Sequence, residues 1–124
     1  MPGNDRLMAF VPIRNADRAR AFYRDTLGLR LLGEDNFALV FDVEGVRLRA
    51  TLVGEFQPQP FTTLGWMVSD TAETARKLTA AGVHIERFPG LDQDELGIWR
   101  APGGAKIVWF KDPDGNILSI TQMP

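Results

Sequence analysis

The stretch Trp109-Phe110-Lys111-Asp112-Pro113-Asp114-Gly115-Asn116-Ile117-Leu118-Ser119-Ile120 decides the fold, because it joins two short apolar runs through a tight turn. Pro113 fixes its own φ at about −65°, and Gly115 accepts a positive φ without a Cβ clash. An Asp-Gly pair between two β-prone runs is a strong hairpin signal. The sequence therefore predicts paired strands over 106–111 and 116–121.

The same succession of elements occurs twice along the chain, with a strand and a helix followed by three or more strands. Each predicted helix begins after a residue that can cap its N-terminus and ends at a glycine. The helices are expected over 16–27 and 71–81, capped by Asn15 and Asp70 and ended by Gly28 and Gly82. The other strands are expected over 6–13, 29–32, 37–41, 46–53, 62–69, 83–87 and 97–101. This order indicates an internal βαβββ duplication.

The duplication predicts an α+β fold in which tandem βαβββ modules form one curved, mostly antiparallel sheet around a cleft. Each half buries too little apolar surface to be stable alone, so the chain is interpreted as a single domain over 1–124, with helices on the convex side of the sheet. Module one covers 6–53, a linker rich in Pro and Gln covers 54–61, and module two covers 62–121.

Composition limits the classes of function. The 124 residues are 44% hydrophobic, carry a formal net charge of −2 and include no cysteine and one histidine. Disulfides, thiolate metal sites and a two-histidine metal site within one chain are therefore excluded. The mixed charge argues against nucleic acid and membrane surfaces as partners. The sequence has no membrane-length apolar run and no signal peptide pattern at its N-terminus, so we expect a cytoplasmic location.

Two motifs resemble a known family. The stretch Ala21-Phe22-Tyr23-Arg24-Asp25-Thr26-Leu27-Gly28-Leu29 resembles the first-helix signature of the glyoxalase, bleomycin-resistance and extradiol-dioxygenase group, the vicinal oxygen chelate superfamily. The stretch Trp109–Ile120 resembles the C-terminal signature of the same group. Together with the duplication, the resemblance covers nearly the whole chain and implies the glyoxalase fold. It also implies a homodimer, with modules either swapped or unswapped between the chains.

The metal of many family members is not expected here. The resemblance places the family's ligand positions at Met8, Arg49, Thr63 and Ser119. These side chains offer a thioether, a cation and two hydroxyls, whereas divalent metals favour imidazole and carboxylate ligands. The chain is therefore identified as a member without the usual metal ligands, and we expect no metal and no other cofactor.

Strand alternation, carried onto this fold, predicts a cleft with an apolar wall, one cation and several hydroxyls. Arg49 would favour a carboxylate, phosphate or enolate on a small-molecule ligand, but it could instead pair with an acid of its own chain, including the loop 92–95. Met8 and Met67 could simply fill space. Trp99 and Trp109 could lie in the core or an interface, or stack on a ligand. The predicted ligand-binding residues are Met8, Phe10, Arg49, Thr51, Thr63, Met67 and Ser119.

Three functions remain open at this stage. The first is a metal-independent protein, resembling the bleomycin-resistance branch, that binds or sequesters a small organic molecule in its cleft. The second is an enzyme of the same superfamily, a glyoxalase-like lyase or isomerase or a dioxygenase-type enzyme, although the cleft offers no convincing general base. The third is a non-catalytic structural or regulatory domain.

Overall fold

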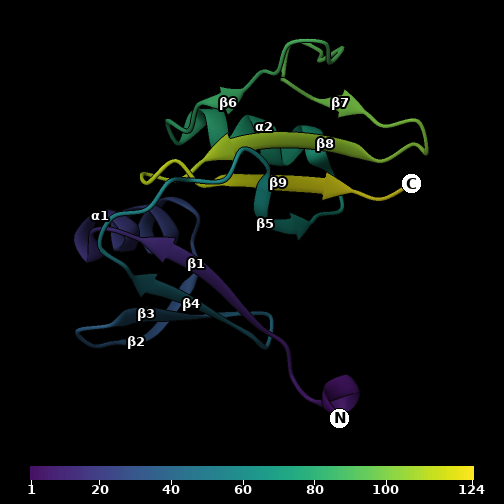
Figure 1. Cartoon of the computed structure of the whole chain (residues 1–124). Helices are drawn as coiled ribbons and strands as arrows, with labels where there is room; N and C mark the ends of the chain where they lie inside the picture. Colours follow the sequence, from purple (N-terminus) through teal and green to yellow (C-terminus); the bar gives the residue numbers. More distant parts are fainter. The chain divides into compact units, whose positions relative to one another are not determined.

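The computed structural model describes all residues, Met1–Pro124, and the chain divides into two compact units, Met1–Gln57 and Pro58–Pro124. Figure 1 labels the elements of both units. Each unit contains one helical segment and its own hydrogen-bonded sheet. The α+β class and the repeated order of strand, helix and further strands are confirmed. Hydrogen bonds close a four-stranded sheet in the first unit and a five-stranded sheet in the second.

The first unit is built around a four-stranded sheet with the strand order β1-β4-β3-β2. The strands β1 and β4 are parallel, and the other two pairs are antiparallel. A short 3-10 turn, η1, precedes the first strand. The elements are η1 (Pro2–Asn4), β1 (Met8–Ile13), α1 (Ala16–Arg20), η2 (Ala21–Thr26), β2 (Arg30–Glu34), β3 (Ala38–Val43) and β4 (Val46–Leu52).

The first helical segment follows the predicted limits but changes its hydrogen bonding partway along. Asn15 caps α1, because its side-chain oxygen accepts a hydrogen bond from the Arg18 N–H at 2.9 Å. From residue 21 onward the helix is a π-helix, η2, and the Leu27 N–H reaches the Phe22 carbonyl at 2.9 Å. Gly28 then ends the segment with φ 78°, as the glycine pattern predicts.

The core of the first unit lies between this helical segment and one face of the sheet. Val11 and Ile13 on β1 are fully buried, as are the β3 residues Leu39 and Phe41. Tyr23 on η2 is fully buried as well, and its ring lies 5.9 Å from that of Phe41. Alternate residues of each strand therefore point to the opposite face, away from the helical segment.

The second unit has the strand order β5-β9-β8-β6, with β7 also paired to β8. The strands β5 and β9 are parallel, and the other pairs are antiparallel. Asp70 caps the helix α2, because its carboxylate accepts a hydrogen bond from the Glu73 N–H at 3.1 Å. The elements are β5 (Thr62–Met67), α2 (Thr71–Ala80), β6 (Ile85–Glu86), β7 (Trp99–Arg100), β8 (Lys106–Lys111) and β9 (Ile117–Gln122).

The predicted hairpin joins β8 and β9, and Gly115 has φ 87° in its turn. A buried carboxylate organises this turn. One oxygen of Asp112 accepts hydrogen bonds from the N–H groups of Asp114 and Asn116, both at 2.9 Å. Its other oxygen accepts one from the Asn116 side-chain amide at 2.8 Å. The turn is therefore fixed by side-chain hydrogen bonds as well as by its Pro and Gly residues.

The helix α2 lies against β8 and β9 and covers one face of the second sheet (Figure 1). Val108 and Phe110 of β8, and Leu118 and Ile120 of β9, point to this side and are buried. The ring of Trp66 on β5 stacks on that of Phe110 at 6.5 Å.

Two strands of the second unit are shorter than predicted. Only Ile85–Glu86 and Trp99–Arg100 form ladders where strands were expected over 83–87 and 97–101. The Gln93 side chain takes the place of the missing ladder hydrogen bonds. Its amide nitrogen donates to the carbonyls of Glu86 and Gly97, and its oxygen accepts from the Phe88 N–H. None of the helices is long and apolar enough to span a membrane.

Candidate functional site

The face of the first sheet that points away from α1 and η2 carries four of the predicted ligand-binding residues. The register pairs Phe10 with Arg49 and Pro12 with Thr51 across β1 and β4, and Val40 with Arg49 across β3 and β4. Met8 lies on the same side of β1 as Phe10, opposite Arg47. We call this surface, made of Met8, Phe10, Val40, Arg49 and Thr51, the first open face.

Arg49 is the unpaired cation of the first open face. Its side chain is half-buried and forms no hydrogen bond or ion pair within the first unit. The neighbouring Arg47 is exposed and paired, with a nitrogen 3.1 Å from an Asp42 oxygen. Arg49 is therefore the one of the two arginines whose guanidinium is available to a ligand.

The carboxylate of Asp35, which lies near Arg49, already accepts hydrogen bonds from the backbone. The backbone N–H groups of Phe37 and Ala38 donate to the Asp35 carboxylate at 2.8 and 3.0 Å. These hydrogen bonds hold the pKa of Asp35 below its usual range, and the charge of Arg49 lowers it further. The positive charge of Arg49 thus acts on the Asp35 carboxylate, but the two side chains form no ion pair. The predicted alternative of an ion pair is not realised within the first unit.

The first open face is otherwise apolar and accessible. Phe10 is 59% exposed and Met8 is 47% exposed; both lie on the edge strand β1, where Phe10 is paired with Arg49 and Met8 with Arg47. Large apolar side chains at such positions are typical of surfaces that bind a partner or a ligand. Met8 is not buried as a space-filling core residue.

The second sheet has a corresponding face turned away from α2. The register pairs Gly65 with Ser119 and Met67 with Thr121, and it pairs Trp109 with Ser119. We call this surface, made of Gly65, Met67, Trp109, Ser119 and Thr121, the second open face. Met67 is 80% exposed, so it also lies outside the core.

The two hydroxyls predicted to line the cleft have local roles on this sheet. The Ser119 hydroxyl fills the space above Gly65, where a Cβ would approach it to 2.4 Å. The strand β5 shifts its register between Thr62 and Leu64, and the Thr63 hydroxyl donates to the Ile117 carbonyl at 3.2 Å. The structure therefore brings Met67 and Ser119 onto one face, whereas the Thr63 hydroxyl is engaged in a hydrogen bond to a backbone carbonyl.

An aromatic cluster that the sequence did not assign lies on the same side of the second sheet. The Trp109 ring lies 6.0 Å from that of Trp99 and 5.5 Å from that of Phe88, with the second pair edge to face. The Trp109 indole N–H donates to the Thr62 hydroxyl at 3.1 Å. Both tryptophans are half-buried and lie opposite the core beneath α2. The register of β7 creates this cluster, and alternation along single strands does not reveal it.

The donor set does not fit a divalent metal. Met8 and Arg49 lie on neighbouring strands of one face, where a thioether and a guanidinium are poor or repulsive ligands. Thr63 is bonded to a backbone carbonyl, and Ser119 is a neutral hydroxyl packed on Gly65. No group of three or more His, Cys, Asp or Glu side chains is placed to hold a metal ion.

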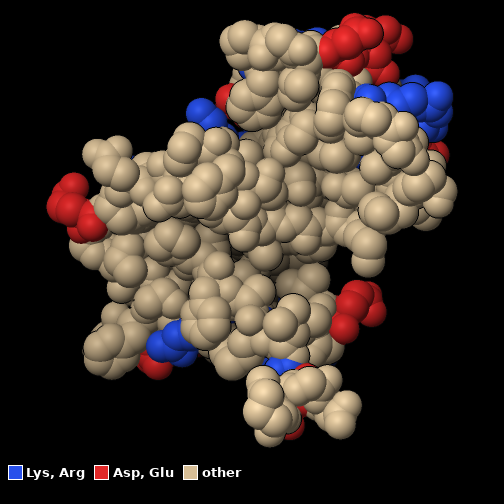
Figure 2. All heavy atoms as spheres, turned by 45° about the vertical axis from the view of Figure 1, so that its right-hand side comes forward, with Lys and Arg blue, Asp and Glu red and all other residues tan.

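Charged side chains occur in small groups on the surface. Figure 2 shows Lys and Arg in blue and Asp and Glu in red, separated by wide uncharged areas on the face drawn. This distribution agrees with the mixed composition, in which 14 basic and 16 acidic residues nearly balance. Single cations such as Arg49 therefore act locally and not as part of one extended basic surface.

Comparison with solved structures finds chains that share the fold of this one. A lactoylglutathione lyase from Agrobacterium tumefaciens superposes with a TM-score of 0.77 at 19% identity, covering 98% of this chain and 95% of that one. A glyoxalase family protein from Enterococcus faecalis gives a TM-score of 0.75 at 21% identity, covering 98% and 99%. A superfamily member from Sphaerobacter thermophilus gives 0.74 at 20% identity, with the same coverage.

The search of curated proteins finds no match. The family comparison, in contrast, is decisive, because residues 5–120 match the profile described as Glyoxalase/Bleomycin resistance protein/Dioxygenase superfamily. The match includes both units, the first-helix motif and the hairpin between β8 and β9. The chain belongs to the Glyoxalase/Bleomycin resistance protein/Dioxygenase superfamily.

Proposed function

We propose that this protein binds a small organic anion on the first open face, without a metal, in the manner of a bleomycin-resistance-like binding or sequestering protein. The observation that carries the proposal is Arg49, a half-buried arginine that has no ion-pair partner in its unit and is paired in register with the apolar Phe10 and Val40. A carboxylate or phosphate on the ligand would supply the missing partner.

The surroundings of Arg49 make such a contact effective. A guanidinium forms two parallel hydrogen bonds to a carboxylate, and charge-assisted bonds of this kind are about twice as strong as neutral ones. Phe10 and Val40 flank the guanidinium and lower the local dielectric constant when a ligand covers it, which strengthens the attraction. Few polar groups in an apolar surface are the usual composition of a small-molecule site.

The aromatic cluster belongs to the second unit and is itself suited to contact with a flat apolar group. Trp99, Trp109 and Phe88 offer large and rigid contact area, and the hydrogen bond to Thr62 fixes the orientation of the Trp109 ring. Half-buried rings on an open sheet face are suited to stacking. Phe10 offers the same kind of contact beside Arg49 on the first open face, so the proposed ligand combines an anionic group with an aromatic or other flat body.

Dimer formation is part of the proposal. The edge strands β1 and β2 close the first sheet, and β5 closes one edge of the second, so each sheet leaves backbone hydrogen-bonding groups open to a second copy. Met8, Phe10 and Met67 add exposed apolar surface. We propose a homodimer, which sedimentation velocity over a range of protein concentrations would test.

The test uses 8-anilinonaphthalene-1-sulfonate, a fluorescent aromatic anion with both of the required features. The dye is titrated into the wild-type chain, an Arg49→Gln variant and an Arg47→Gln variant. The second variant is a matched control, because it removes an arginine two positions away that is already paired with Asp42.

Loss of one charge-assisted contact should raise the dissociation constant of the dye about tenfold for Arg49→Gln. The Arg47→Gln variant should bind the dye within about twofold of the wild type, because rim charges contribute little to affinity. Equal affinity of all three chains would overturn the proposal. Circular dichroism spectra confirm that each variant retains its fold.

A further inference from the structure

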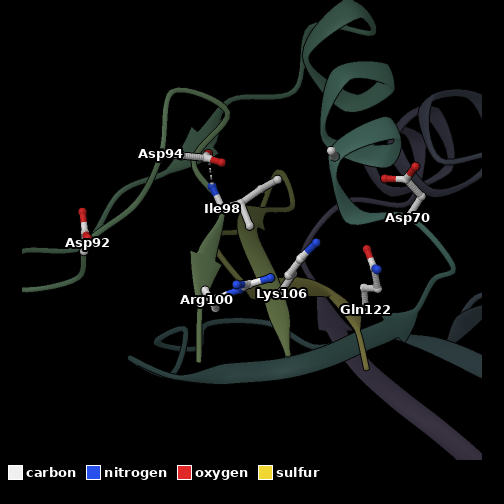
Figure 3. Close-up of a pocket in the computed structure, with 8 residues that line it drawn as sticks. Asp70, Asp92, Asp94, Ile98, Arg100, Lys106 and Gln122 are labelled. Carbon is white, nitrogen blue, oxygen red and sulfur yellow. Dashed lines mark hydrogen bonds between the residues drawn. The ribbon is translucent and has the colours of Figure 1, made fainter. Parts of the chain in front are cut away.

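A hollow of about 400 Å³ lies in the second unit, on the side of the sheet covered by α2 (Figure 3). It is formed where β7 ends, β8 begins and β9 ends, next to the first turn of α2. It lies on the opposite side of the sheet from the second open face. Lys106 points to the same side of β8 as the buried Val108, whereas Ile107 and Trp109 point to the other side. It also belongs to a different unit from the first open face, which carries the proposed function.

Three polar side chains form one row across this end of the sheet. The register pairs Arg100 with Lys106 across β7 and β8, and Lys106 with Gln122 across β8 and β9. Figure 3 shows the side chains of Arg100 and Lys106 alongside each other in the hollow. Like charges directly opposite each other on paired strands are destabilising. Arg100 and Lys106 therefore form an unfavourable pair at this position.

Three carboxylates, Asp70, Asp92 and Asp94, also line the hollow, but none of them forms an ion pair with either cation. Asp94 is engaged by the N–H groups of Leu96 and Ile98, both at 2.9 Å. Asp70 accepts from the Glu73 N–H and caps α2. Asp92 points away from the cations (Figure 3). Neither Arg100 nor Lys106 forms an ion pair or a side-chain hydrogen bond, although both line the hollow.

Further donors surround the cation pair. The Gln122 side-chain oxygen accepts a hydrogen bond from the Thr71 N–H at 3.0 Å, which leaves its amide N–H groups available. The Ala72 N–H, on the wall of the hollow, has no acceptor. The hollow thus offers two cations without an ion-pair partner together with neutral donors, while Asp70 and Asp94 accept hydrogen bonds from backbone N–H groups.

We propose that this hollow is a second binding site, for a small anion with a carboxylate or phosphate group. An anion bound between Arg100 and Lys106 would accept charge-assisted hydrogen bonds and remove the repulsion between the two side chains. The same row places Gln122 within the site as a neutral donor. The cation pair carries this proposal, and it stands independently of the ligand on the first open face.

The experiment is a titration of the isotope-labelled full chain, followed by two-dimensional 1H–15N NMR spectra. Inorganic phosphate and acetate are added in separate titrations at constant ionic strength, which is balanced with sodium chloride. Saturating shifts of the Ala72 and Gln122 signals with phosphate, acetate or both are expected, and the more effective ion identifies the class of anion. Shifts that stay linear, or that are absent from these signals, would overturn the proposal.

Two variants separate the site from general electrostatics. Lys106→Gln should weaken anion binding about tenfold, because it removes one charge-assisted contact. Arg76→Gln is the matched control, since Arg76 is an exposed arginine of α2 that does not line this hollow. Its binding should remain within about twofold of the wild type. Equal weakening by both variants would show non-specific screening and overturn the proposal.

Discussion

Replacing Asp112 tests whether a single buried carboxylate holds the hairpin between β8 and β9. The residue is 5% exposed and accepts hydrogen bonds from the Asp114 N–H, the Asn116 N–H and the Asn116 side-chain amide. A hydrogen bond to a charged group contributes about 1.5–3 kcal/mol, and bonds that share one acceptor are not additive. We expect Asp112→Ala to lower the free energy of unfolding by about 3–4 kcal/mol.

Two further variants test the hydrogen bond between the side chains at positions 112 and 116. Asp112→Asn keeps one acceptor oxygen for the two backbone N–H groups but turns a second amide toward the amide of Asn116, so it should cost about half as much as Asp112→Ala. The double variant Asp112→Asn/Asn116→Asp exchanges donor and acceptor. Because the amide at position 112 can then donate to the carboxylate at position 116, the double variant should regain most of the lost stability.

Urea unfolding followed by tryptophan fluorescence provides the measurement. All three tryptophans lie in the second unit, so the signal reports on the unit that contains the hairpin. The denaturation midpoint should fall in the order wild type, Asp112→Asn, Asp112→Ala. A cost below about 1 kcal/mol for Asp112→Ala, or a double variant no more stable than Asp112→Asn, would show that the Asp112 carboxylate does not hold the hairpin.

Three other predictions follow from individual contacts. Gly65→Ala should destabilise the chain by about 1–3 kcal/mol, because its Cβ would lie 2.4 Å from the Ser119 hydroxyl, and Ser119→Ala in the same chain should restore at least half of this loss; additive costs would contradict the contact. The pKa of Asp35 is lowered in the folded state, so its carboxylate stabilises the fold above its usual pKa and this contribution is lost as the pH falls through the lowered value. The stability difference between the wild type and Asp35→Asn, measured by circular dichroism, should therefore shrink in acid, and a constant difference would contradict the assignment. Arg100→Gln should raise stability by about 0.2–1 kcal/mol in the absence of anions by removing the repulsion from Lys106, and a lower midpoint would argue against the unfavourable pair.

Local signals in the sequence predicted the elements that depend on neighbouring residues. The caps Asn15 and Asp70 and the terminating Gly28 lie where the pattern placed them. The hairpin strand over 106–111 matches β8 residue for residue, because turn chemistry fixes both of its ends. Alternation also predicted correctly that Phe10 lies opposite Val11 and Ile13 on its strand and that Arg49 lies opposite Leu48 and Ala50 on its own.

Features that depend on register could not be predicted in the same way. Alternation gives the face of a residue but not its partner on the next strand. The shift in β5 between Thr62 and Leu64 changes the surroundings of Thr63, and no residue type in β5 signals it. The π-helical hydrogen bonds of η2, which contains the fully buried Tyr23, were likewise not indicated by any local signal in the sequence.

The Arg100–Lys106 pair was within reach of the sequence. The two residues flank a stretch that contains Pro102, Gly103 and Gly104, and Ala101 accepts the turn hydrogen bond from the Gly104 N–H at 2.9 Å. A hairpin about this turn places the two cations opposite each other. The aromatic cluster around Trp109 could not be predicted from the sequence in this way, because Phe88 reaches it from a loop that is held by hydrogen bonds of the Gln93 side chain.

The most direct test of ligand binding at the first open face is to observe the Arg49 side chain itself. The Nε–H signals of arginines are resolved in 1H–15N spectra, and Arg49→Gln identifies the signal of this residue. On titration with naphthalene-2-sulfonate, we expect a saturating shift of the Arg49 signal together with the Phe10 and Thr51 amides, and no shift at the paired Arg47. A ligand that binds while the Arg49 signal stays unchanged would contradict the central claim.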